Sequence, residues 1–190
     1  MKSCAIPLAM TNKTIRRATI DDAEALSRIS ADTFGETFGH LYAPEDLDYH
    51  LATFSSVAYF TEALADPTVN LWVIDGDTPE HLIAYMKTGA VDLPIENPGP
   101  DSYELHRLYV VSSAKRQGLG RRLMDLFLRE ATEKGATKLY LGVYSENWPA
   151  QAFYRSFGFE KMGEYIYPVG NHEDLEFIFS RDWDGAAGTL

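Results

Sequence analysis

The apolar positions of the chain follow two different periods, and segments of the two kinds alternate along the sequence. Leu119, Leu123, Leu126 and Phe127 recur at helical spacing, which predicts an amphipathic helix over residues 118–134. Shorter apolar and aromatic runs on either side of such helices predict strands. The alternation predicts an α/β domain (mixed α+β), in which helices pack on a sheet that has a parallel portion.

The first half of the chain predicts one strand, three helices and a hairpin. Acidic residues in a first turn mark the start of helices at Asp21 and Pro44, and Ser55 or Ser56 is a suitable cap for the third. Two apolar runs on either side of a turn-forming Asp-Gly predict the hairpin. The predicted elements are a strand at 14–19 and helices at 21–33, from 44 onward and at 55–66, followed by a hairpin spanning 70–86.

The second half predicts four strands and two helices. Gly135 and Gly158 end the helices, and Asn147 is a suitable N-cap with Pro149 in the first turn. The proline-rich stretch 92–100 predicts a surface loop. The predicted strands span residues 103–111, 138–144, 159–167 and 175–180, and the helices span 118–134 and 147–157.

Length, charge and cysteine content narrow the class of protein. The 190 residues suit one domain, expected at 14–182, with a disordered leader at 1–13 and a flexible tail at 183–190. A net charge of −11 disfavours nucleic-acid and membrane partners. Cys4 is the only cysteine, which excludes an intrachain disulfide.

The sequence also bears on location and metal binding. It has no apolar run long enough to span a membrane, so we expect a cytoplasmic protein. The histidines do not have the spacing of metal ligands, so no metal is assigned.

The loop at residues 115–122 reverses the acidic balance of the chain. Four of the 17 basic residues lie in these eight positions, between a predicted strand and a long helix. Gly118 and Gly120 let backbone N–H groups converge on a ligand, and the helix start adds positive charge, which favours a pyrophosphate. A capping turn with solvated arginines is the alternative. The loop lacks the Gly-Lys-Ser/Thr of a P-loop, and Leu123 replaces the third glycine of a dinucleotide fingerprint.

Two motifs resemble those of the GNAT superfamily of N-acetyltransferases. Residues 115–120 (KRQGLG) are similar to its acetyl-CoA loop, with Lys115 where Arg or Gln is usual. Residues 147–159 (NWPAQAFYRSFGF) are similar to its Asn-x6-Tyr motif followed by Gly-Phe. The resemblance implies the GNAT acyl-CoA N-acyltransferase fold, with a mixed, mostly antiparallel sheet of about seven strands that splays between strands 4 and 5 and is flanked by helices. It also implies acetyl-CoA as cosubstrate.

A finer resemblance points to the acceptor. Residues 33–47, 104–110, 141–147 and 164–170 are similar to the bacterial PaiA-like polyamine acetyltransferases. This resemblance implies acetyl transfer to a primary amine, a small molecule or a polyamine, by direct attack in a ternary complex. Amino acids, aminoglycosides or protein N-termini are alternative acceptors, and a CoA-binding regulatory protein without catalysis is a further alternative. A homodimer is compatible with the resemblance, because late strands in this superfamily often pair between subunits.

The resemblance also assigns residues to the cosubstrate. It places the pantetheine arm along main-chain groups of strand 4 and the pyrophosphate on the basic loop, while Asn147 orients the pantetheine or caps its helix. The residues so assigned are Leu108, Tyr109, Val110, Lys115, Arg116, Gln117, Gly118, Leu119, Gly120, Arg121, Asn147 and Tyr154.

The expected chemistry needs an acid for the leaving thiolate and a base for the amine. Tyr154 matches the family tyrosine that faces the CoA sulfur. Glu104 and His106 lie two apart on one predicted strand, so both are expected on one face, with Glu104 favoured as the base. Carboxylates in the segment that covers the acceptor would suit a polycation, although acids in a first helical turn also serve as caps. The expected acceptor residues are Glu36, Tyr42 and Glu45, with Asp46 and Asp48 nearby.

Overall fold

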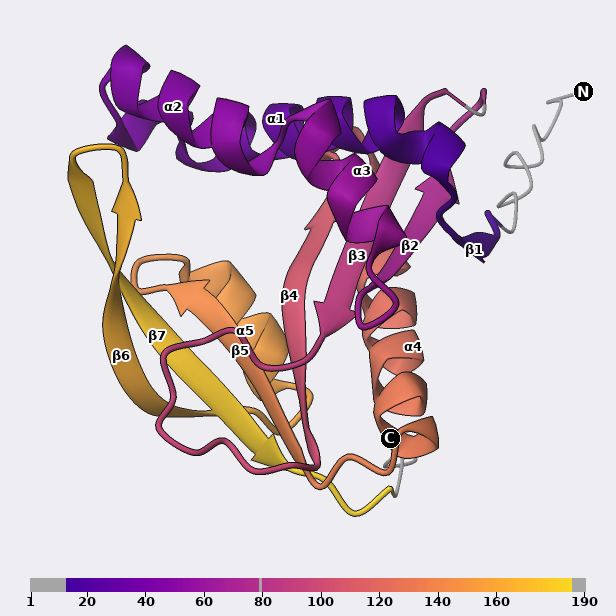
Figure 1. Ribbon diagram of the computed structural model, residues 1–190, viewed down its shortest axis with the longest axis vertical. Coiled ribbons are helices and arrows are strands. Elements are labelled where there is room, and N and C mark those ends of the chain that lie inside the picture. The colour runs from indigo at the N-terminus through magenta and orange to yellow at the C-terminus, as the bar shows by residue number, and fades with distance from the viewer. Residues whose placement is uncertain (1–12, 79, 186–190) are drawn as a thin grey trace, which may run out of the picture.

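A seven-stranded sheet forms the centre of the molecule. The computed structural model describes residues 13–78 and 80–185, and its strands lie in the order β1-β2-β3-β4-β5-β7-β6 (Figure 1). All neighbouring strands are antiparallel except β4 and β5, which run parallel. The predicted mixed, mostly antiparallel sheet of about seven strands, with a parallel portion, is confirmed.

The first four strands hold three helices in their connections. Ser56, one of the two serines predicted as caps, caps α3 by accepting a hydrogen bond from the Tyr59 amide. The first helix continues past its predicted end at Thr33 because an apolar stripe persists to Phe38. The elements are β1 (Ile15–Arg17), α1 (Ala23–Phe38), α2 (Pro44–Phe54), α3 (Val57–Ala65), β2 (Asn70–Asp75), β3 (Leu82–Gly89) and β4 (Ser102–Val110).

The last three strands follow two further helices. Asn147 caps α5 by accepting a hydrogen bond from the Ala150 amide, as predicted. The final two strands form a hairpin that is longer than the sequence predicted. The elements are α4 (Leu119–Glu133), β5 (Lys138–Tyr144), α5 (Trp148–Arg155), β6 (Glu160–Val169) and β7 (His172–Asp182).

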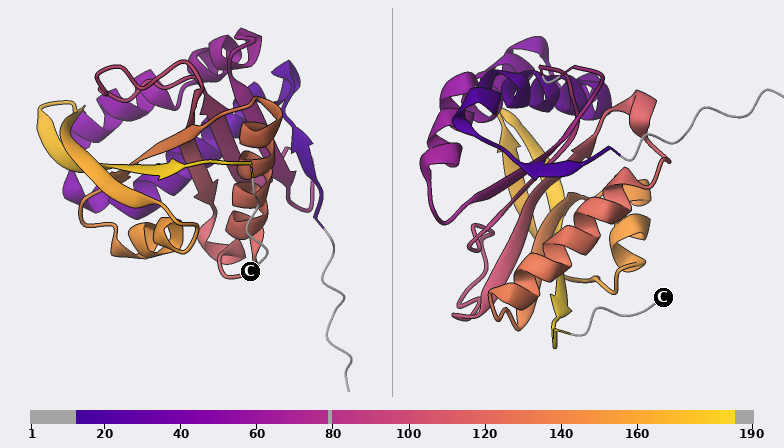
Figure 2. Two further views of the ribbon diagram at one scale, coloured as in Figure 1. Left: turned by 90° about the horizontal axis from the view of Figure 1, so that it is seen from below. Right: turned by 90° about the vertical axis from the view of Figure 1, so that its right-hand side faces the viewer.

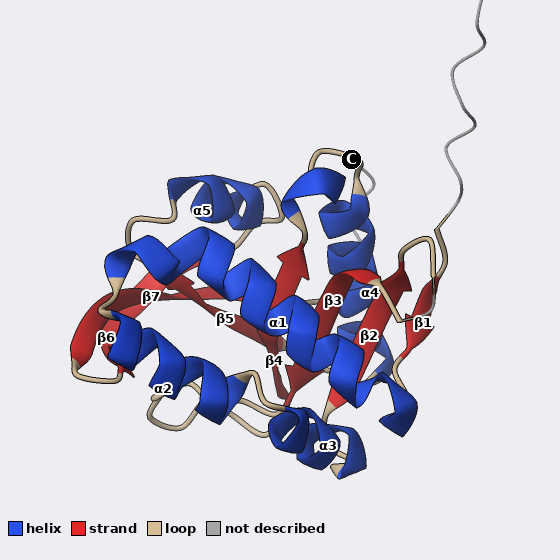
Figure 3. Ribbon diagram, turned by 90° about the horizontal axis from the view of Figure 1, so that it is seen from above, coloured by secondary structure: helices blue, strands red, loops and turns tan. Residues whose placement is uncertain are grey.

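Helices cover both faces of the sheet and bury two separate apolar clusters. On β2, Trp72 and Ile74 face one cluster and Leu71 and Val73 face the other, as strand alternation requires. The larger cluster lies under α4 and α5, and the smaller lies under α1 and α3. Figures 2 and 3 show these two groups of helices with the sheet between them. We refer to the α4/α5 face and the α1–α3 face of the sheet below.

Packing continues past residue 182, where the domain was expected to end. Trp183 is buried, its amide donates to the Thr137 carbonyl, and its indole donates to Thr132, so ordered packing reaches one residue beyond 182. The expectations for residues 1–12 and 186–190 lie outside the described residues. Among the described helices, none has the length and apolarity needed to cross a membrane.

Candidate active site

Strands β4 and β5 separate halfway along their length. They pair from Ser102 to Leu105 against Lys138 to Leu141, and their pairing ends there although both strands continue. Beyond that point, no described strand pairs with the edge of β4 that faces β5 (Figure 1). Leu108, Tyr109 and Val110 lie on this edge, whose free N–H and C=O groups can pair with an extended ligand.

The loop before α4 has an unusual backbone. Arg116 and Gly118 both have positive φ, at 62° and 80°, and Gly118 is the N-cap of α4 without a capping side chain. The first N–H groups of α4 therefore receive no side-chain partner. Left-handed residues in such a turn direct successive N–H groups to one side and form a concave anion site. Lys115, Arg116, Gln117 and Gly118 are exposed, so this loop is free to receive a phosphate.

Close packing joins the loop to the point where the strands separate. A Cβ atom on Gly120 would lie 3.5 Å from Phe153 of α5 and 3.9 Å from Leu108 of β4. The start of α4, the unpaired edge of β4 and helix α5 thus meet at one place. Arg121 stays on this side, with its guanidinium 5.0 Å from the centre of the Phe157 ring.

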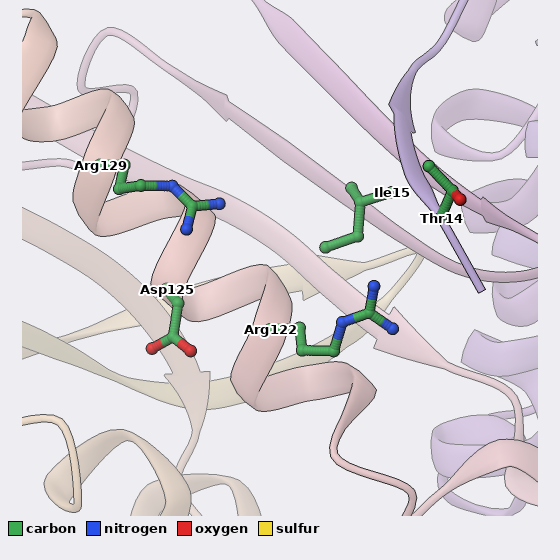
Figure 4. A pocket seen from close by; sticks show the side chains of 5 residues that line it. All are labelled: Thr14, Ile15, Arg122, Asp125 and Arg129. Atoms are coloured by element: carbon green, nitrogen blue, oxygen red, sulfur yellow. The ribbon is translucent and has the colours of Figure 1, made fainter. Parts of the chain in front are cut away.

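Arg122, the fourth basic residue of the loop, points elsewhere. Its guanidinium donates to the Lys13 carbonyl and borders a polar groove between β1 and α4, together with Asp125 and Arg129 (Figure 4). The basic side chains that are adjacent in the sequence therefore point to two different places. The groove beside β1 is separate from the region where β4 and β5 separate.

Tyr154 extends from α5 toward the separated strands. Its ring packs at the edge of the rings of Phe153 and Phe159, and among the described residues its hydroxyl has no hydrogen-bond partner. Burial and the nearby Glu176 carboxylate raise the pKa of Tyr154. The phenol therefore stays protonated at neutral pH and can donate a proton or a hydrogen bond.

Glu104 reaches the same region from the α1–α3 face. It is only 5% exposed, and one carboxylate oxygen accepts hydrogen bonds from the amides of Asp92 and Leu93, at 2.7 and 3.0 Å. Burial raises the pKa of Glu104 to about 7, against the opposing effect of those two amides. A carboxylate with this pKa is suited to act as a base near neutral pH.

His106 lies in a β-bulge. Lys87 of β3 faces Arg107, but the next residue, Thr88, faces Leu105, so His106 is the extra residue on β4. The simple alternation assumed for Glu104 and His106 is therefore interrupted, although both side chains contact residues 89–93. Because the Nε2 atom of His106 bonds the Ala90 carbonyl, that nitrogen carries the proton. Burial and Lys87 lower the pKa of His106 to about 4.

The expected acceptor residues are spread over different environments. Tyr42 donates its hydroxyl hydrogen to a carboxylate oxygen of Asp174 on β7. Glu36 and Glu45 are exposed on their helices. Asp46 accepts hydrogen bonds from the Asn171 amide and side chain, which ties α2 to the turn between β6 and β7.

Sequence reasoning missed the polar residues of the β6–β7 hairpin. Asp174 and Glu176 lie on the same face of β7, opposite Tyr167 and Tyr165 of β6, and Tyr165 donates to Glu176 at 2.6 Å. A Cβ on Gly142 would lie 3.0 Å from both the Glu176 carboxylate and the Tyr165 hydroxyl, so this glycine leaves room for the pair. The signal in the sequence is an acid at every second position, 174 and 176, directed inward rather than to solvent.

Comparisons with known proteins give matches over most of the chain. The family model described as Acetyltransferase (GNAT) family matches residues 24–159. An uncharacterised N-acetyltransferase of Lactobacillus delbrueckii subsp. lactis is 26% identical over 90% of this chain and 98% of its own length. An uncharacterised N-acetyltransferase of Mycobacterium tuberculosis is 28% identical over 85% of this chain and 97% of its own length.

Solved structures share the fold at low sequence identity. The PaiA N-acetyltransferase of Thermoplasma acidophilum in complex with coenzyme A superposes with a TM-score of 0.71, at 18% identity, over 90% of this chain and 98% of that one. The ribosomal-protein-S18-alanine N-acetyltransferase of Escherichia coli gives a TM-score of 0.66, at 21% identity, over 94% and 98%. Only the Escherichia coli name states an acceptor, and the fold alone leaves the acceptor of this chain open.

Proposed function

The chain belongs to the GNAT family of acetyltransferases and is an acetyl-CoA-dependent N-acetyltransferase, and we propose that its acceptor is the primary amine of a small polycation such as a polyamine. In this proposal the amine attacks directly in a ternary complex. The observation that supports it best is that Tyr154 and Glu104 approach the point where β4 and β5 separate from opposite faces of the sheet.

The backbone holds the cosubstrate in this proposal. The unpaired edge of β4 at residues 108–110 takes the pantetheine arm as an added strand, and the loop at 115–120 takes the pyrophosphate. An N–H group near Val110 faces the thioester carbonyl and stabilises the negative charge that develops on its oxygen. Acetyl-CoA supplies the activated acetyl group, and these main-chain groups orient it.

Two side chains move the protons. Glu104 accepts the proton of the ammonium, directly or through water, because its pKa of about 7 leaves a large share of the carboxylate ionised at neutral pH. His106 is the weaker candidate, because its pKa is lowered to about 4 and its Nε2 atom is bonded to Ala90. Tyr154 gives a proton to the leaving thiolate, and its hydroxyl has no competing partner among the described residues.

Negative charge favours a cationic acceptor. Three carboxylates lie on the α1–α3 face of the sheet: Glu104, Asp174 and Glu176. Tyr42, one of the expected acceptor residues, donates a hydrogen bond to Asp174. The structural neighbour named PaiA shares the fold at 18% identity, which leaves the acceptor open. A homodimer and a cytoplasmic location accompany this proposal as expectations from the sequence.

One observation favours a second candidate, an α-amino acid acceptor. Arg107 donates to the Phe54 carbonyl and to Ser30, and no carboxylate of the described residues forms an ion pair with it. Lys87 beside it donates to the Tyr59 hydroxyl. An acceptor that carries both an amine and a carboxylate could place its carboxylate at these two cations.

A panel of acceptors tests both candidates. The full chain is incubated with acetyl-CoA and one amine at a time, and thiol release is followed for spermidine, n-butylamine, an α-amino acid and an aminoglycoside. We expect the highest kcat/KM with spermidine. A preference for the amino acid would overturn the polycation proposal in favour of the second candidate. Acetyl-CoA binding in calorimetry without acetylation of any amine would instead indicate a binding protein without catalysis.

A further inference from the structure

Two buried polar atoms of the described residues have no hydrogen-bond partner. They are the Nδ1 atom of His50 on α2 and the Oδ1 atom of Asp174 on β7. Their residues are 3% and 4% exposed, so bulk water does not compensate them. Buried polar groups nearly always have partners, and those that lack one often face a ligand or an ordered water.

Both atoms border one cluster of rings. The His50 ring stacks on Phe34 with 4.2 Å between centroids and meets the edge of Tyr167, which is the register partner of Asp174. Tyr42 stacks on the same Phe34 and donates to the other oxygen of Asp174. Residues from α1, α2 and both strands of the hairpin therefore surround these two atoms.

The chemistry of this cluster favours a cation with several N–H groups. Asp174 offers a carboxylate oxygen. Burial and Arg107 lower the pKa of His50 to about 4, so its ring is neutral at pH 7 and has one nitrogen that accepts a hydrogen bond. The Tyr42 and Tyr167 rings beside these atoms are electron-rich, which also favours a nearby cation. A protonated amine has three donors and no acceptor, which matches this set.

The surrounding charges direct a cation to the hairpin. Glu176, next along the same face of β7, adds negative charge, and its field acts on Tyr154 as well as on Tyr42. The two cations of this face lie at Tyr59, where Lys87 donates to the hydroxyl and Arg107 lies 4.8 Å from the ring centre. The charge of Arg107 also reaches His50, so Asp174 and Glu176 supply the attraction for a cation. His172, whose side chain is 44% exposed, has its Nε2 atom 3.3 Å from the Oδ1 atom of Asp174 and is the neighbour that an incoming ammonium would displace.

We infer that Asp174 and His50 form a subsite for a second protonated nitrogen of the acceptor, while its reacting nitrogen lies at Glu104 and Tyr154. This inference rests on the proposed function and adds the residues that distinguish a diamine from a monoamine. Glu176 lies between the positions of the two acceptor nitrogens and contributes negative charge to both.

The test compares two amines of equal length. Thiol release is measured with 1,4-diaminobutane and with n-butylamine for the wild type, Asp174→Asn and Glu173→Gln. The asparagine keeps an oxygen that accepts the Tyr42 hydroxyl, removes the charge and replaces the other oxygen with an NH2 donor, which an ammonium cannot use. Glu173 is exposed on the opposite face of β7 and serves as the matched control. We expect Asp174→Asn to lower kcat/KM for the diamine at least tenfold and to leave the monoamine unchanged, with Glu173→Gln like the wild type.

A second variant separates binding from folding. His50→Phe removes the unpartnered nitrogen and keeps an aromatic ring, so it should melt at or above the wild-type temperature while the diamine KM rises about threefold. Equal losses for both amines in Asp174→Asn, or an unchanged preference for the diamine, would overturn the subsite.

Failure of the proposed function has a different signature. If the wild type acetylates neither amine, calorimetry of 1,4-diaminobutane with the CoA-loaded protein still tests the subsite. Binding that weakens at least tenfold in Asp174→Asn supports the inference, and equal binding by the wild type and the variant, or no binding to the wild type, overturns it.

Discussion

The two sides of the candidate site are built in different ways. On the α4/α5 face, the expected cosubstrate groups are mainly backbone atoms from two short stretches, 108–110 and 115–120, which are close in sequence. On the α1–α3 face, the groups are side chains from α1, α2, β4 and the β6–β7 hairpin. A backbone site tolerates changes of side chain, whereas a side-chain site changes its specificity with each substitution. This difference suits a constant cosubstrate and a variable acceptor.

Replacement of Tyr154 by Phe should give the largest effect and separate the two sides most clearly. The ring packing is kept and the proton donor is lost, so kcat should fall about 100-fold or more while the affinity for acetyl-CoA is unchanged. Turnover and calorimetry measure the two quantities. Tyr140→Phe, which removes a buried hydroxyl on β5 that bonds Pro98, is the control and should retain activity. Undiminished turnover of Tyr154→Phe would remove this residue from the chemistry.

Glu104→Gln should abolish a feature of the pH profile. The wild type is expected to show an inflection in kcat/KM near pH 7, because the base must be deprotonated and its pKa is raised to about 7. The variant should lose about tenfold or more at neutral pH and show no inflection there. Glu130→Gln removes another buried carboxylate, bonded to Trp72 and Thr88, and should keep the wild-type profile. An inflection that persists in Glu104→Gln would place the base elsewhere.

The same substitution should change how stability depends on pH. The pKa of Glu104 is raised on folding, so the folded chain binds its proton more tightly and loses stability as pH rises toward 7. Glutamine cannot titrate. Between pH 5 and pH 8 the variant should therefore gain about 2 kcal/mol of unfolding free energy relative to the wild type. Denaturant titrations at both pH values measure this gain, and a difference that is independent of pH would contradict the raised pKa.

Gly118→Ala tests whether the backbone holds the cosubstrate. A Cβ at Gly118 meets no atom within 4 Å, but its φ of 80° is unfavourable for alanine, so the loop should distort. We expect the Kd for acetyl-CoA to rise about tenfold as the N–H groups lose alignment. Gly135→Ala is the matched control, with a φ of 68° and open space at the other end of α4. Equal effects of the two variants on Kd would argue against a phosphate site.

Arg116→Gly should have the smallest effect. Glycine relieves the strain of a positive φ but increases the freedom of the unfolded chain, so the unfolding free energy should change by about 1 kcal/mol or less. The loss of one exposed charge should weaken acetyl-CoA binding about threefold at low salt and less at high salt. A large loss that is independent of salt would show that the side chain, rather than the backbone, makes the main contact.

The sequence predicts local features of the candidate site better than features that depend on tertiary contacts. Gly118 and Asn147 act on their own neighbours in the chain, so a local pattern is enough to locate them. The bulge at His106 arises from pairing with β3, and strand alternation alone cannot reveal it. Asp174 and His50 border the same ring, Tyr167, only because the hairpin folds against α2. The approach of Glu176 to Tyr165 depends on the absence of a side chain at Gly142.

Amide hydrogen exchange of the wild type with and without CoA tests most directly whether the two sides of the site are separate. We expect protection by CoA at residues 108–110 and 116–120, and no change at Tyr42 or Asp174. Protection centred instead on the groove between β1 and α4, or on the β6–β7 hairpin, would contradict a cosubstrate held by the backbone where β4 and β5 separate.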